Sequence, residues 1–231
     1  AFITVLIPEL LGTRQRGFYC DDVSIQQPFY DHTIPMGRMT LVSLALFLII
    51  PLAIEYLIVA KDESVTPSYR WGQLSCPAFV ANALVIFGYS HIGFTMQVAL
   101  TQIAKFGTGR LRPHFMDVCK PIGFTCTEQN QYITNYTCTG TNAHRIREVR
   151  LSFFSGHSST AIYVALFIAL YLESRLGSRR LYKRGRRIVQ GVLIVSALVV
   201  CGTRVTDNFH HPTDVLVGII FGAVFAVFSV S

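Results

Sequence analysis

The sequence predicts an all-α fold, a bundle of six transmembrane helices that forms one domain over residues 1–231. Three observations predict it. Of the residues, 51% are hydrophobic and only 14% are charged, and mean hydropathy is +0.44, a balance atypical of a water-soluble globule. The apolar residues also fall into long runs, because short polar segments separate them. Neither strand-like alternation nor an internal repeat of about 20 to 50 residues accompanies these runs, and backbone satisfaction in lipid favours helices.

Each apolar run has about the length that a membrane span needs. A bilayer core about 30 Å thick requires roughly 20 mostly apolar residues per helix, and fewer where polar ends reach the interface. Five runs qualify: Leu41–Ala60, Pro77–Ala104, Ser158–Leu172, Ile188–Gly202 and Val215–Val230. A sixth, Ala1–Leu11, is short and lacks the basic flank of a signal peptide. We expect it to be the end of a first helix, and we expect the first and last helices to be truncated.

Helix alternation assigns the connecting segments to two sides of the membrane. Residues 13–39, 105–155 and 203–213 fall on one side, and residues 61–76 and 173–187 on the other. The second side carries a basic cluster: Arg175, Arg179, Arg180, Lys183, Arg184, Arg186 and Arg187. By the positive-inside rule that side is cytoplasmic, so the first side is extracellular or lumenal. Between two membrane helices, this cluster indicates a topology determinant that contacts anionic membrane lipids rather than nucleic acid.

Cysteines and a glycosylation sequon support this orientation. Asn135-Tyr136-Thr137 is an N-glycosylation sequon, which is used only on a lumenal or extracellular face. Four cysteines fall on the same side: Cys20, Cys119, Cys126 and Cys138. An oxidising compartment permits disulfides among them. Cys126 with Cys138 would close a short loop around the sequon, although connectivity does not follow from sequence.

Three polar motifs lie at the outer ends of apolar runs. They are Lys105 with Arg112-Pro113, Ser155-Gly156-His157, and Arg204 with His210 and Asp214. Together they supply three cations, two imidazoles and one carboxylate, which suits a phosphate monoester and a histidine nucleophile. The sequence has no Cys-x-x-Cys, no His pair at helical spacing with a Glu, and no acidic cluster. We therefore predict chemistry that needs neither a metal ion nor a cofactor.

The first two motifs are suited to holding an anion. Lys105 offers a point charge and Arg112 a planar fork of donors, although cations at a helix end can also simply contact lipid headgroups. Ser155 and Gly156 precede an apolar run, so that free backbone N–H groups at a helix start can face the phosphate. A helix cap followed by a buried histidine is the plainer interpretation of Ser-Gly-His. Ser155 as a nucleophile is disfavoured because no Gly-x-Ser-x-Gly elbow surrounds it.

The third motif predicts an oriented histidine. Pro212 suits the first turn of a helix, which places His210 just before that helix and Asp214 within its first turn. We expect Asp214 to hydrogen-bond one imidazole nitrogen of His210 and to direct the other towards phosphorus. His211 is the competing nucleophile. Arg204, at the end of the preceding helix, completes the phosphate cradle.

These three motifs, in this order and spacing, resemble the signature of the type 2 phosphatidic acid phosphatase superfamily. The sequence around these motifs, Gly109 to Phe115 and Ser152 to Ser159, is similar to that of the animal lipid phosphate phosphatases. The sequence departs from the usual pattern at Phe154, where Pro is usual, and at Thr203, where Ser is usual. Motifs, helix number and loop order match across nearly the whole chain.

The resemblance implies roles for the site residues. His210 attacks phosphorus to form a phosphohistidine, Asp214 supports the imidazolium, and His157 protonates the leaving alkoxide and then activates water. Lys105, Arg112, Ser155, Gly156 and Arg204 bind the phosphate. Implied substrates are phosphatidate, lysophosphatidate, sphingosine 1-phosphate and ceramide 1-phosphate, and the implied location is the plasma membrane, with the site at the outer membrane interface. A homo-oligomer is compatible with the sequence.

Alternatives remain at this point. A catalytically silent scaffold or lipid-binding relative would keep the bundle without the chemistry, and a relative acting on a soluble phosphate ester would share the motifs. Four polar residues lie inside predicted membrane helices, where we expect interhelical hydrogen bonds rather than a second site: Glu55, Asn82, His91 and Gln97.

Overall fold

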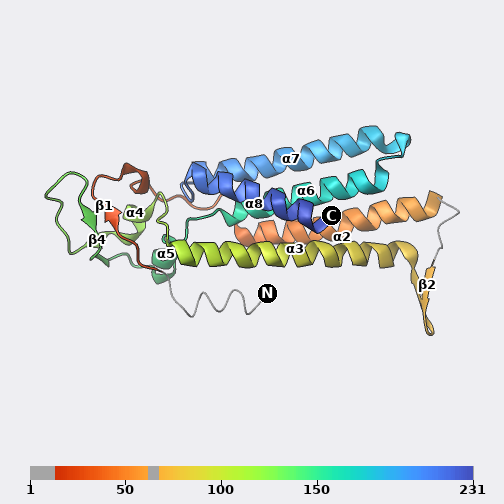
Figure 1. Ribbon diagram of the computed structural model, residues 1–231, viewed down its shortest axis with the longest axis horizontal. Coiled ribbons are helices and arrows are strands. Elements are labelled where there is room, and N and C mark those ends of the chain that lie inside the picture. The colour runs from red at the N-terminus through yellow and green to blue at the C-terminus, as the bar shows by residue number, and fades with distance from the viewer. Residues whose placement is uncertain (1–13, 62–67, 231) are drawn as a thin grey trace.

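Five long helices form the body of the protein (Figure 1). The computed structural model describes residues 14–61 and 68–230. The helices are α2 (Met36–Lys61), α3 (Ala78–Thr108), α6 (Gly156–Leu176), α7 (Lys183–Thr206) and α8 (Pro212–Val230). Within the described residues, these five are long and apolar enough to cross a membrane. Each matches a predicted apolar run, whereas the sixth candidate, Ala1–Leu11, lies outside the described residues.

Most helices extend beyond the apolar runs that predicted them. For example, α2 begins at Met36 rather than Leu41, and α7 begins at Lys183 rather than Ile188. Hydropathy marks only the segment inside hydrocarbon, while a helix continues into the interface, where polar side chains reach water. In contrast, α8 begins at Pro212 as predicted, with Asp214 in its first turn.

The central helix of the bundle is α6, which packs against all four other long helices. Its apolar side chains form the middle of the core, together with Phe47 of α2 and Ala226 of α8: Tyr163, Val164, Phe167, Ile168, Tyr171 and Leu172. Two glycines let α8 approach α6 closely. A Cβ at Gly218 would lie 2.7 Å from Ser155 O, and one at Gly222 would overlap Ser159 O. Small residues four apart commonly allow such close helix contact in membranes.

Polar residues inside the bundle mostly join neighbouring helices. Glu55 of α2 accepts from Asn82 of α3 (3.1 Å) and from Tyr171 of α6 (2.9 Å), and it pairs with Arg175. Gln97 of α3 likewise bonds to α6, where its Nε2 donates to Thr160 Oγ1 at 2.9 Å. The predicted interhelical bonds are therefore confirmed for Glu55, Asn82 and Gln97.

The same prediction is wrong for His91. Its Nδ1 lies 2.8 Å from Phe87 O, one turn earlier in its own helix. A histidine can satisfy one ring nitrogen on the preceding turn, so it needs no partner from another helix here.

A compact cap covers one end of the bundle (Figure 1). It is built from residues 14–35 and 109–155, with short helices α4 (Phe115–Cys119) and α5 (Ala143–Glu148) and a 3-10 turn at Val23–Ile25. Two antiparallel pairs cross it: β1 (Phe18–Tyr19) with β5 (Tyr132–Ile133), and β4 (Pro121–Ile122) with β6 (Thr137–Cys138). A third pair, β2 (Ser68–Trp71) with β3 (Leu74–Pro77), lies at the other end, as does a 3-10 turn at Arg180–Tyr182. Strands of two to four residues are too short to show alternation in sequence, which is why none was predicted.

Two disulfides hold the cap, and their pairing corrects the sequence-based candidate. The bonds join Cys20 to Cys126 and Cys119 to Cys138, so the Cys126–Cys138 pair is wrong. The β4–β6 ladder sets Pro121 opposite Cys138, which brings Cys138 next to the end of α4. All four cysteines expected on the outer side are paired. Among the described residues, Cys76 and Cys201 are free.

Candidate active site

All three polar motifs meet where the bundle touches the cap. The end of α3, the beginnings of α6 and α8 and the end of α7 lie together there (Figure 1). A cavity of about 330 Å³ opens between them. Its lining includes six of the predicted residues: Lys105, Arg112, Gly156, His157, Arg204 and His210. Ser155 and Asp214 do not line the cavity and lie behind it.

The first motif supplies two cations from one sharp turn. Helix α3 ends at Gly109, whose positive φ of 57° lets its N–H bond back to Lys105 O at 3.1 Å. The chain then turns inwards, and Arg112 N donates to Val149 O at 2.8 Å. The Arg112 side chain is only 5% exposed, and its Nη2 donates to Glu148 Oε2 at 2.9 Å. Its buried Nε has no hydrogen-bond partner among the described residues, so a donor is available to an anion in the cavity.

The second motif begins α6, and its three residues have different positions relative to the cavity. Ser155 is the N-cap, and its Oγ accepts from Ser158 N at 3.3 Å and from Ser158 Oγ at 3.0 Å. The Ser155 hydroxyl therefore stabilises the helix start, and the Ser155 backbone N–H, expected to face the phosphate, donates to Asp214 O at 3.1 Å. Gly156 lines the cavity, where an added Cβ would lie 3.7 Å from Lys105 Nζ. His157 follows, and its Nε2 donates to Ile34 O at 3.2 Å, because a carbonyl oxygen only accepts.

A strap that precedes α2, residues 29–35, closes the cavity from the cap side. Thr33 N and Oγ1 bond to the two carboxylate oxygens of Asp207 at 3.0 and 2.7 Å. Asp207 also pairs with Arg204, which is fully buried, at 2.9 Å. His32 stacks on Phe209 with ring centroids 3.8 Å apart, and its Nδ1 lies 3.2 Å from Arg204 Nη1. Burial, followed by the charges of Arg204 and Arg112, lowers the pKa of His32 from 6.5.

His210 is held with one ring nitrogen occupied. Its Nδ1 donates to Ser152 O at 2.7 Å, so a neutral ring keeps its lone pair on Nε2. The ring is 3% exposed. Burial, with the charges of Arg112 and Lys105, holds the pKa of His210 well below 6.5, which favours that neutral form. The arrangement suits a nucleophile facing a cationic cavity.

The expected hydrogen bond from His210 to the Asp214 carboxylate is not made, because His210 Nδ1 lies 3.9 Å from Asp214 Oδ2. The buried carboxylate instead accepts from Ser152 Oγ at 2.6 Å and from Arg110 Nη1 at 2.5 Å. Backbone N–H of His211 donates to the same group at 3.2 Å. Ser152 therefore links the two side chains, since its hydroxyl donates to Asp214 and its carbonyl accepts from His210.

The neighbouring basic side chains His211, Arg110 and His114 do not line the cavity. His211 Nε2 donates to Leu111 O at 3.0 Å, and His211 does not line the cavity, which makes it a poor nucleophile. Arg110 pairs with Asp214, as already described. His114 is 1% exposed and bonds Asn208 O at 2.7 Å, and burial and the Arg112 charge lower its pKa to about 4.

Sequence reasoning missed several cavity or supporting residues, among them His32, Glu148 and Ser152. Ser152 stands in the quoted segment before Ser155, so its position gave a signal. His32 and Glu148 carried none, because they enter from the strap and from α5. Within the described residues, no group of three or more His, Cys, Asp and Glu side chains is placed to hold a metal ion.

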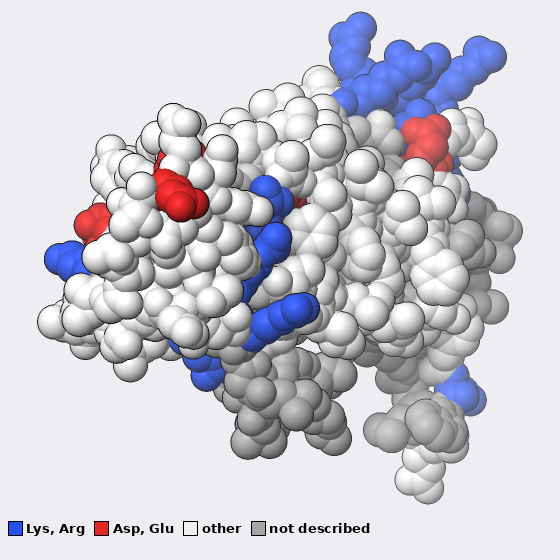
Figure 2. Space-filling model, turned by 60° about the vertical axis from the view of Figure 1, so that its left-hand side comes forward, with Lys and Arg blue, Asp and Glu red and all other residues white. Residues whose placement is uncertain are grey.

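Charge on the surface matches a membrane protein with a site at one end. In Figure 2 the visible flank of the bundle is almost free of charged atoms. Lys and Arg gather at the far end, around the loop between α6 and α7. The fold and site together define a multi-pass helical membrane protein with a buried, cationic, two-histidine cavity at one membrane interface.

Comparison with known proteins gives the family. Residues 83–231 match the PAP2 superfamily, and this chain belongs to that family. The Caenorhabditis elegans phospholipid phosphatase homolog 1.2 homolog is 43% identical over 95% of this chain, which spans 65% of that relative's length. Rat phospholipid phosphatase 1 is 38% identical over 92% of this chain and 73% of the relative.

A solved structure is similar at a greater distance. It is the first transmembrane PAP2 type phosphatidylglycerolphosphate phosphatase from Bacillus subtilis, with a TM-score of 0.41 and 20% identity. The match covers 83% of this chain and 92% of that one. So distant a likeness carries no detail of the site.

Proposed function

We propose that this protein is a metal-independent lipid phosphate phosphatase that works through a phosphohistidine at His210. One observation carries the proposal: His210 faces a cavity that also holds Lys105, Arg112 and Arg204, and its Nδ1 is occupied by Ser152 O. Membership of the PAP2 superfamily and relatives named phospholipid phosphatases support it.

The first step transfers the phosphoryl group. Nε2 of His210 attacks phosphorus, the bond to the lipid oxygen breaks, and its electron pair leaves with that oxygen. His157, on the wall of the same cavity, donates a proton to the departing alkoxide. The charge spread over the phosphoryl oxygens is stabilised by the three cations.

The second step releases phosphate. A water molecule attacks phosphorus, His157 takes its proton, and the bond from phosphorus to Nε2 breaks with its electrons returning to the ring. Throughout, Nδ1 keeps its proton and donates it in a hydrogen bond to Ser152 O. The ring is therefore cationic while the phosphoryl group is attached to Nε2. The Asp214 carboxylate, 3.9 Å away, stabilises this imidazolium through charge.

Substrates of this site are phosphate monoesters of membrane lipids. The cavity lies at the ends of α3, α6, α7 and α8, where a headgroup meets the interface and the tails stay in the bilayer. Phosphatidate, lysophosphatidate, sphingosine 1-phosphate and ceramide 1-phosphate all present such a group. The cavity is proposed to face the extracellular or lumenal side of the plasma membrane.

Asn135, exposed between β5 and β6, is the proposed glycosylation site on that side, and digestion with an endoglycosidase tests it.

The test is phosphate release from phosphatidate in detergent micelles with EDTA present. We expect release by the native chain and its loss in His210→Ala. His211→Ala is the matched control, since the neighbouring histidine lies outside the cavity and should retain activity. Release that stops with EDTA would refute metal independence. No release from a folded chain with several lipid phosphates would favour a silent scaffold, and release from soluble esters alone would favour a soluble substrate.

A further inference from the structure

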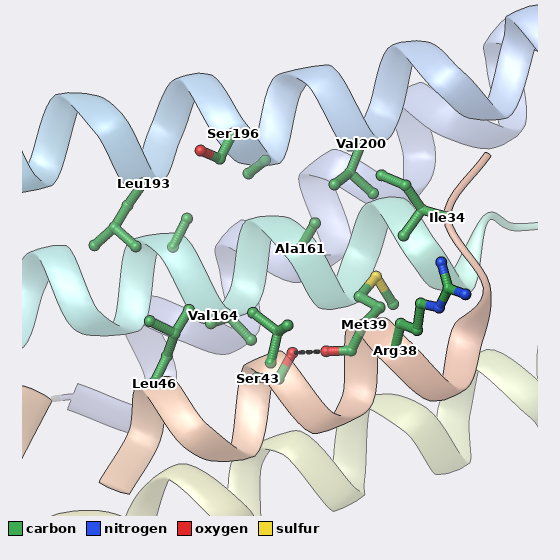
Figure 3. Close-up of a pocket in the computed structure, with 13 residues that line it drawn as sticks. Ile34, Arg38, Met39, Ser43, Leu46, Ala161, Val164, Leu193, Ser196 and Val200 are labelled. Carbon is green, nitrogen blue, oxygen red and sulfur yellow. Dashed lines mark hydrogen bonds between the residues drawn. The ribbon is translucent and has the colours of Figure 1, made fainter. Parts of the chain in front are cut away.

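An apolar groove runs along the bundle between α2, α6 and α7, with a volume of about 270 Å³ (Figure 3). The hollow exists because small side chains face it from α6 and α7: Ala161, Ala165, Ser196 and Ala197. Ser43, a polar side chain in its wall, is satisfied by Met39 O at 2.8 Å. The groove therefore offers almost only hydrocarbon to an occupant.

This groove begins one helical turn below the cavity. Ala161 stands four residues after His157 in α6, and Val200 stands four residues before Arg204 in α7. Four residues rise about 6 Å along a helix, and residues four apart share a face. The helix faces that carry His157 and Arg204 at the cavity therefore continue directly as two walls of the groove.

The start of α2 links the two spaces. Ile34 lines the groove, while its carbonyl lies 3.2 Å from His157 Nε2 in the cavity. Met36 lines the cavity and Met39 the groove. Figure 3 shows Ile34 and Arg38 at the same end of the groove. Cavity and groove therefore share residues 34–39 as their common edge.

We propose that the groove holds one acyl chain of the lipid phosphate whose headgroup is bound in the cavity, a proposal that rests on the proposed function. The cavity presents three cations, which suit a phosphate, and the groove presents apolar side chains. A molecule that fills both must be anionic at one end and a hydrocarbon chain at the other. Arg38, exposed at the junction, is placed to donate to the carbonyl oxygen that joins chain and headgroup.

Orientation, rather than affinity, is what such a groove contributes. A chain in the bilayer is already in hydrocarbon, so moving it into the groove brings no hydrophobic gain. A chain held along α2 fixes the direction from which its phosphate enters, and aligned reactants react faster. The effect is therefore expected in kcat/KM for substrates that bear a chain, and not for those that lack one.

Two matched pairs of variants test the groove. The measurement is the ratio of kcat/KM for a long-chain phosphatidate to kcat/KM for glycerol 3-phosphate. Val200→Phe fills the groove and should lower this ratio about tenfold, equivalent to about 1.4 kcal/mol. Val199→Phe is its control, because Val199 is 59% exposed on the lipid-facing surface and should leave the ratio unchanged. Ser196→Phe with Val195→Phe repeats the comparison one turn lower. Equal ratios within both pairs would overturn the proposal.

A binding measurement separates this inference from the proposed function. A phosphatidate with a diazirine in one acyl chain is photolysed with the His210→Ala chain, and adducts are mapped by mass spectrometry. Adducts on the groove walls of α2, α6 and α7, reduced by unlabelled phosphatidate but not by diacylglycerol, support the groove. Equal competition by both lipids, or adducts spread over α3 and α8, would show a surface open to any bilayer lipid and overturn it. Groove adducts on the His210→Ala chain, combined with a folded native chain that hydrolyses no phosphate ester, would refute the proposed phosphatase activity alone.

Discussion

Replacing Asp214 by Asn tests whether this carboxylate acts on His210 through charge. Asn is nearly the same size, and its amide oxygen can still accept from Ser152 Oγ or Arg110 Nη1. The change therefore removes charge while the packing around a fully buried side chain is kept. In the proposed reaction, His210 becomes an imidazolium whose Nδ1 lies 3.9 Å from Asp214 Oδ2.

The expected magnitude follows from that distance. Two unit charges about 4 Å apart in an environment of effective dielectric about 20 attract by about 4 kcal/mol. Because each 1.36 kcal/mol is tenfold in rate, kcat should fall by about a thousandfold. KM should change little, because the bound substrate meets a neutral His210 in both proteins.

Steady-state release of phosphate from a phosphatidate in micelles measures both constants. Ser152→Ala, which keeps the carbonyl and removes the hydroxyl, is the companion variant. Its loss of one hydrogen bond to a charged group, about 1.5–3 kcal/mol, should lower kcat by less than Asp214→Asn does. A folded Asp214→Asn chain with kcat within tenfold of the native value would refute the electrostatic role.

Three further predictions concern stability. Cys126→Ser opens the disulfide that spans 106 residues and should lower the unfolding free energy by about 4–5 kcal/mol. Cys138→Ser opens the disulfide that spans 19 residues and should lower it by about 3 kcal/mol. Equal shifts in the thermal unfolding of the two variants would contradict this order. His114 has a pKa of about 4 in the folded protein and 6.5 when exposed, so the unfolded state binds the proton first as the pH falls, and about 3 kcal/mol of stability present above pH 6.5 should be lost towards pH 4. His114→Gln should flatten that part of the pH profile of thermal unfolding. An unchanged profile would show that this histidine is not responsible. Gly222→Ala sets a Cβ against Ser159 O and should lower the unfolding free energy by about 1–3 kcal/mol and reduce activity. Gly191→Ala, whose added Cβ would have nothing within 4 Å, should be tolerated. Similar melting temperatures for the two variants would mean that α8 shifts to relieve the contact.

Membrane helices were predictable because hydrocarbon allows few solutions, and five apolar runs reappear as α2, α3, α6, α7 and α8. The cavity was predictable in outline because each motif lies at a helix end on the same side. Partner choice was not predictable. Asp214 was expected to bind His210, yet Ser152 occupies Nδ1, because the backbone before Ser155 comes nearer than the carboxylate does.

Parts contributed by the cap escaped sequence reasoning for a related reason. His32 lies in the cavity next to Thr33, which bonds to Asp207, a contact between residues 174 positions apart. The disulfide partners were likewise set by ladders of two residues, which leave no periodic trace. Long-range contacts made by short segments depend on the whole fold, so local pattern does not reveal them.

The position of Asp214 on α8 also sets the order in which the site can be assembled. Chains are synthesised and inserted from the N-terminal end, and α8 is the last helix among the described residues. Until it enters the membrane, Arg110 lacks its carboxylate partner and Ser152 lacks the acceptor for its hydroxyl. His210 directly precedes the same helix, so the proposed nucleophile and Asp214 arrive in one event. On the proposed mechanism, a nascent chain therefore carries the cationic side chains of the cavity before it carries the nucleophile, and the site is complete only when the last described helix is in place.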